Sequence, residues 1–91
     1  MELNINGKKV ELKYTMRAMI MYENITNAVF SPKTISDIIT LFYCVVLSSM
    51  KDYTLTFETF LDWLDENTDE LTNFSQWLQD INGNTERLKK N

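Results

Sequence analysis

The fold is decided by residues 35–50, ISDIITLFYCVVLSSM, which contain the densest apolar run of the 91-residue chain, LFYCVVL at 41–47. Apolar side chains recur here at helical spacing over sixteen residues, which is too long for a typical strand. They are Ile35, Ile38, Ile39, Phe42, Val45, Val46 and Met50. The run 41–47 taken alone is also compatible with a strand. The helical spacing over the whole segment predicts a buried central helix at about 35–50.

Residues 2–14, on the N-terminal side of this helix, have the pattern of a β-hairpin. Apolar residues alternate with polar ones on both sides of Asn6-Gly7. Asn-Gly favours a two-residue type I′ turn because both positions need a positive φ. In that register Leu3 pairs with Val10, so the apolar side chains of both strands share one face. A lone two-stranded hairpin is marginal in water, and we therefore expect this face to pack on helices.

Three further helices are predicted at about 16–26, 57–66 and 69–82. Threonines suited to N-capping precede each of them, at Thr15, Thr56 and Thr68. The central helix has two candidate starts, with either Ser31 before Pro32 or Thr34 as its cap. The side chains expected to face the core from the three further helices are Ala18, Met21, Tyr22, Ile25, Phe57, Phe60, Leu61, Leu64, Leu71, Phe74, Leu78 and Ile81.

These elements predict one mainly α (α+β) domain over residues 1–83, with an N-terminal hairpin packed on a bundle of about four helices. Asn82-Gly83 is predicted to end the last helix, because glycine favours the position after a helix C-terminus. Residues 84–91 are then expected to form a flexible tail. A hydrophobic content of 44% with only two glycines and one proline is typical of a chain that folds.

The residue types present argue against an enzyme. The chain has no histidine and one cysteine, Cys44, so the usual nucleophilic triads and zinc sites cannot be assembled. Residues 65–76 fail as a calcium loop, because its sixth position is Glu70 and its twelfth is Gln76. We predict no catalytic, cofactor-binding or metal-binding residue, and we expect Cys44 to be an inert core thiol.

The charge is distributed unevenly along the chain. The net charge is −4, but residues 52–86 carry nine acidic residues and no basic one. This segment argues against a nucleic-acid groove, because phosphates are bound by clustered lysine and arginine. It is compatible with a solvated helix face or with a basic protein partner. The longest apolar run is far shorter than the roughly twenty residues of a membrane span, and no signal-peptide pattern opens the chain, so a cytoplasmic protein is expected.

Eight side chains are candidates for partner binding. A methionine-rich stripe on the first helix is either core packing or a docking surface. Two tryptophans are either core-edge packing or contact residues, and three acidic residues belong to the acidic segment. The eight residues are Met16, Met19, Ile20, Trp63, Trp77, Asp62, Asp65 and Glu66.

Four segments occur in an order that has a parallel in a known family. They are INGKKVELKYTMRA at 5–18, YENIT at 22–26, IITLFYCVVLS at 38–48 and LTFETFLDWLDEN at 55–67. This order resembles that of small tail assembly chaperones of long-tailed bacteriophages and prophages, over roughly residues 3–80. The resemblance implies a non-catalytic protein of the bacterial host cytoplasm that binds the tape measure protein and helps recruit tail tube subunits. It implies neither a nucleic-acid nor a membrane partner, and homo-oligomer formation stays open.

A second functional class also fits the acidic segment. A small acidic regulatory adaptor would bind a basic DNA-binding protein through this segment. Such binding would depend steeply on salt concentration, whereas an apolar chaperone contact would depend on it weakly.

Overall fold

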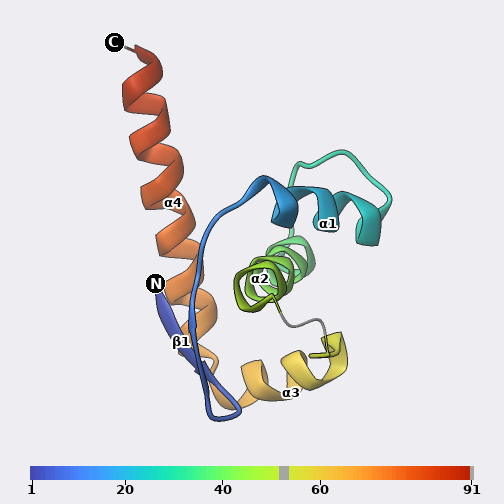
Figure 1. The fold of residues 1–91 in the computed structure, drawn as a ribbon. Helices are drawn as coiled ribbons and strands as arrows, with labels where there is room; N and C mark the ends of the chain where they lie inside the picture. The colour runs from blue at the N-terminus through green and yellow to red at the C-terminus, as the bar shows by residue number, and fades with distance from the viewer. Residues whose placement is uncertain (52–53, 91) are drawn as a thin grey trace.

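The computed structural model describes residues 1–51 and 54–90, and describes side chains as far as Asn82. The strands are β1 (Glu2–Ile5) and β2 (Lys8–Glu11), and the helices are α1 (Met16–Thr26), α2 (Ile35–Met50), α3 (Phe57–Glu66) and α4 (Asp69–Lys90) (Figure 1). The prediction of a mainly helical fold with an N-terminal hairpin is therefore confirmed. No helix in the described part of the chain combines the length and the apolar content needed to cross a bilayer.

The hairpin has the register that its turn predicts. Asn6 and Gly7 both have positive φ, at 51° and 86°, as a type I′ turn requires. Leu3 pairs with Val10 across the antiparallel strands. The apolar side chains of both strands are buried, while their polar neighbours are exposed. The hairpin is therefore one-sided, and its apolar face belongs to the core of the protein.

The helix starts follow threonine residues. The hydroxyl oxygens of Thr15, Thr34 and Thr56 each accept a hydrogen bond from the backbone N–H three residues later. Thr34, and not Ser31, caps α2, and the Asp37 carboxylate accepts from the Thr34 N–H in return, at 3.1 Å. The Asp37 carboxylate also accepts from the Lys33 N–H at 2.9 Å, and the pKa of Asp37 is lowered chiefly by this bond and the Thr34 bond. This capping box shows that α2 begins after Thr34, the second of the two starts that the sequence allowed.

Helix α2 is the centre of the molecule. Figure 1 looks along its axis and shows α1, α3, α4 and the hairpin arranged around it. Every residue from 41 to 48 is buried, so this part of the helix is covered on all sides. The Phe42 ring stacks on Phe74 with 4.2 Å between centroids and meets the Phe60 ring edge-on at 5.2 Å. One aromatic cluster therefore joins α2, α3 and α4.

Three side chains that the helical spacing places inward are exposed instead. Ile25, Ile35 and Phe57 are each more than a third exposed. All three lie in the first or last turn of their helices. Phe57 is covered in part, because its ring meets the Tyr43 ring of α2 edge-on at 5.2 Å. The periodic pattern was therefore wrong at the helix ends, where it says nothing about how far a neighbour extends.

The predicted end of the last helix also differs from the structure. Helix α4 continues past Asn82-Gly83 to Lys90. A glycine inside a helix costs about 1 kcal/mol relative to alanine, and the Glu, Arg, Leu and Lys residues that follow are good helix formers. The predicted flexibility of residues 84–91 lies outside what the structure describes.

Candidate functional site

Helix α1 leaves large apolar side chains in contact with solvent. Met16 is 74% exposed and Ile20 is 55% exposed, and their spacing of four residues places them on the same side of the helix. The α1 apolar surface is defined here as these two side chains. Only Ala18 and Tyr22 of this helix are fully buried, because α1 meets α2 along a narrow face. Val29 follows in the connection to α2 and is exposed as well.

The structure divides the predicted methionine stripe. Met16 and Ile20 face solvent, whereas Met19 is half-buried. Met19 lies on the side of α1 closer to Tyr22, which is buried in the core. Of this stripe, Met16 and Ile20 are therefore the side chains that expose most surface to a partner.

The two tryptophans also differ. Trp63 is buried, and its indole N–H donates to the Asn4 backbone oxygen at 3.0 Å. This bond links α3 to β1, so Trp63 is a core residue that offers no surface to a partner. Trp77 on α4 is half-buried and lies against Tyr14, with 6.4 Å between ring centroids. Of the two, only Trp77 has an accessible edge.

The three acidic candidates lie on α3. Asp62, Asp65 and Glu66 are exposed, and within the described residues none of them forms an ion pair. Figure 1 shows α1 and α3 on different sides of α2. The eight candidate residues therefore do not form one site, because the α1 apolar surface and the acidic side of α3 are separated by the central helix.

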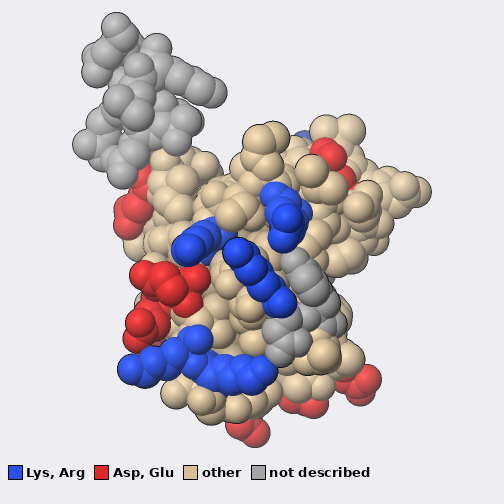
Figure 2. Space-filling view, viewed as in Figure 1, with Lys and Arg blue, Asp and Glu red and all other residues tan. Residues whose placement is uncertain are grey.

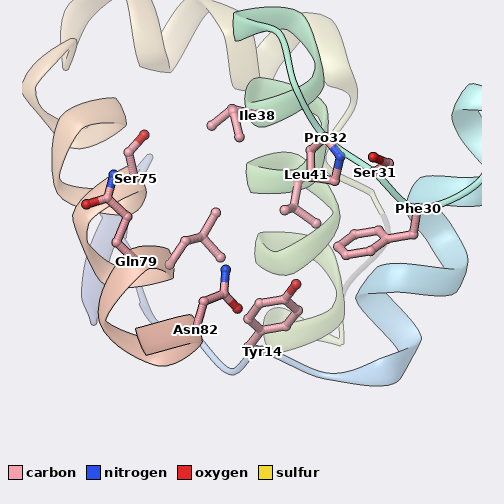
Figure 3. Close-up of a pocket in the computed structure, with 10 residues that line it drawn as sticks. Tyr14, Phe30, Ser31, Pro32, Ile38, Leu41, Ser75, Gln79 and Asn82 are labelled. Carbon is pink, nitrogen blue, oxygen red and sulfur yellow. The ribbon is translucent and has the colours of Figure 1, made fainter. Parts of the chain in front are cut away.

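A groove between α2, α4 and the 30–32 connection was not predicted from the sequence. Figure 3 shows its lining, which encloses a volume of about 510 Å³. The residues are Tyr14, Phe30, Ser31, Pro32, Ile38, Leu41, Ser75, Leu78, Gln79 and Asn82. The one available signal is the spacing of Ser75, Gln79 and Asn82, which places three polar side chains on one face of α4 among its apolar positions.

The polar side chains of this groove are suited to hydrogen bonding. Among the side chains described up to Asn82, those that line it carry hydroxyl and amide groups and no carboxylate or thiol. Burial raises the pKa of Tyr14, which keeps its hydroxyl protonated. Such a lining can donate and accept hydrogen bonds.

Cys44 lies in the core, as its position in the apolar run predicts. It is fully buried in α2, and burial raises the pKa of the thiol to about 11. The thiolate is the reactive form of cysteine, so the side chain is unreactive at neutral pH.

Comparisons with models of protein families, with curated proteins and with solved structures give no match to this chain. The resemblance to tail assembly chaperones therefore stays a prediction that rests on the four quoted segments.

Proposed function

We propose that this chain is a non-catalytic phage tail assembly chaperone that holds an amphipathic helical segment of the tape measure protein against α1. In this proposal the α1 apolar surface covers apolar side chains of the client until the tail tube subunits assemble around it. The observation that carries the proposal is the exposure of Met16 and Ile20 on one side of a well-capped helix.

Two properties of this surface support such a client. Apolar side chains four residues apart form the seam along which a second helix packs. Methionine is flexible and adapts to different partner surfaces, which suits a client with many similar helical segments. The negative net charge of the chain would keep the complex soluble.

The regulatory adaptor is the second candidate, and a specific observation favours it. Asp62, Asp65 and Glu66 are exposed together on α3. A basic protein could bind there without touching α1. The two candidates therefore predict different contact surfaces on the same molecule.

Co-expression with the tape measure protein of the same genome tests the proposal. Met16→Lys and Ile20→Lys should each abolish co-purification of the client while leaving the thermal midpoint close to that of the wild type. Thr72→Lys adds the same charge at an exposed position of α4 and should leave capture intact. Undiminished capture by both α1 variants would contradict the proposal.

The adaptor is tested by Asp62→Lys combined with Asp65→Lys. If this variant loses a basic DNA-binding protein that the wild type binds, and if both α1 variants keep it, the adaptor is the correct function. In the chaperone, this double variant should capture the tape measure protein normally.

A further inference from the structure

Three basic side chains from two distant parts of the sequence line one hollow. Lys13 follows the hairpin, Arg17 lies in the first turn of α1, and Lys51 is the C-cap of α2. The hollow has a volume of about 320 Å³ and is also lined by Thr15, Ser48 and Ser49. Figure 2 shows basic side chains gathered over the face where these elements lie. We call this site the basic hollow.

Backbone and hydroxyl contacts hold the walls of the basic hollow together. The Lys13 N–H donates to the Ser49 hydroxyl at 2.9 Å, and the Thr15 hydroxyl lies 3.5 Å from the Ser48 hydroxyl. These contacts join the hairpin exit and the start of α1 to the end of α2. The three basic residues are therefore carried by segments that contact one another, and their side chains are exposed.

The charges in the basic hollow are not compensated by the described part of the chain. Of the residues that the structure describes, none with an acidic side chain lines the hollow, and Lys13, Arg17 and Lys51 form no ion pair with any of them. The N-terminal end of a helix carries a partial positive charge, and α1 has Arg17 but no acidic residue in its first turn. Arg17 and this helix end repel each other, whereas Lys51 lies at the C-terminal end of α2, which carries a partial negative charge. A bound anion would therefore be attracted chiefly by Lys13, Arg17 and the N-terminal end of α1.

The basic hollow adjoins the α1 apolar surface. Arg17 directly follows Met16 and precedes Ile20 by one helical turn. A partner that covers Met16 and Ile20 therefore reaches the hollow at the N-terminal end of α1. Carboxylates on that part of the partner would meet the Arg17 guanidinium, whose planar donors match a carboxylate.

We propose that the basic hollow binds carboxylates of an acidic protein segment, located at one end of the apolar seam of the client. This inference rests on the proposed function for the identity of the client. A nucleic acid fits the site less well, because it requires a long basic track, whereas the hollow has three basic side chains in one place.

The test uses two synthetic helical peptides with the same leucine seam. One peptide ends in Glu-Glu-Glu and the other in Gln-Gln-Gln. They are titrated into ¹⁵N-labelled protein at constant ionic strength. The Glu peptide should bind about tenfold more tightly and should shift the amide signals of Arg17, Ser49 and Lys51. Arg17→Gln should remove this difference in affinity, whereas Lys33→Gln, at an exposed lysine outside the hollow, should preserve it.

Three outcomes would overturn the inference. Equal affinity for both peptides would show that the hollow does not recognise carboxylates, and would leave the α1 apolar surface as the docking site. Failure of the Glu peptide to shift the Arg17, Ser49 and Lys51 signals would show that the hollow is not used. Tighter binding of inorganic phosphate than of the Glu peptide at these amides would identify a small-oxyanion site instead. The proposed function is judged separately, by capture of the tape measure protein through Met16 and Ile20.

Discussion

Helices α1 and α3 have similar lengths and the same kind of N-cap, yet they use their apolar residues differently. They contain 11 and 10 residues, and a threonine hydroxyl caps each. Helix α3 buries Phe60, Trp63 and Leu64, and the side that it exposes carries acidic residues. Helix α1 buries one large side chain, Tyr22, and leaves Met16 and Ile20 exposed. Helix α3 therefore contributes mainly to stability, whereas α1 retains apolar area that a partner can cover.

The largest expected loss of stability follows a substitution in α3. Phe60→Ala should lower the free energy of unfolding by about 3–5 kcal/mol, because Phe60 is fully buried and its ring meets Phe42 edge-on. Denaturant unfolding measures the loss. Phe60→Leu serves as the control and should recover much of the stability, because it keeps most of the buried volume. A loss below about 1 kcal/mol for Phe60→Ala would show that α3 is not part of the core.

A smaller effect is expected where α3 meets the hairpin. Trp63→Phe keeps an aromatic ring but removes the donor to the Asn4 oxygen, and it should cost about 1–2 kcal/mol. Denaturant unfolding again measures the change. Trp77→Phe is the matched control on α4 and should cost less, because Trp77 is only half-buried. A larger loss of stability for Trp77→Phe than for Trp63→Phe would contradict the assignment of Trp63 to the core.

The caps provide a comparison in which the two helices should behave alike. Thr15→Ala and Thr56→Ala each remove the hydroxyl that accepts a backbone N–H, and each should cost about 1 kcal/mol. Serine at either position should restore most of the stability. A negligible effect at Thr15 alone would indicate that the start of α1 frays despite its cap.

The smallest effect is expected on the exposed side of α1. Ile20→Lys should change the free energy of unfolding by less than about 0.5 kcal/mol, because Ile20 makes no contribution to the buried core. Met19→Lys should cost more, since Met19 is half-buried, and thermal unfolding of the two variants measures the difference. If Ile20→Lys were the more destabilising, the exposed side of α1 would contribute to packing and not to partner binding.

Local signals in the sequence were sufficient to predict the hairpin and the helices themselves. Asn6-Gly7 determines the hairpin turn and its register, because few other dipeptides accept two positive φ angles. The apolar run at 41–47 identifies the buried helix, and a threonine precedes every helix whose N-cap the structure describes. These features depend on residues close together in the chain, which is why they can be predicted.

Long-range packing decided which surfaces are available to a partner. The sequence alone determined an acidic, mainly helical protein with a one-sided hairpin and a buried Cys44. Periodicity could not separate Met19 from Ile20 or Trp63 from Trp77, because burial depends on how far a neighbouring helix extends. The basic hollow joins Lys13 and Arg17 to Lys51 across more than thirty residues of sequence. Only the tertiary structure brings these charges together, because their proximity arises from the packing of the hairpin and α1 on the end of α2.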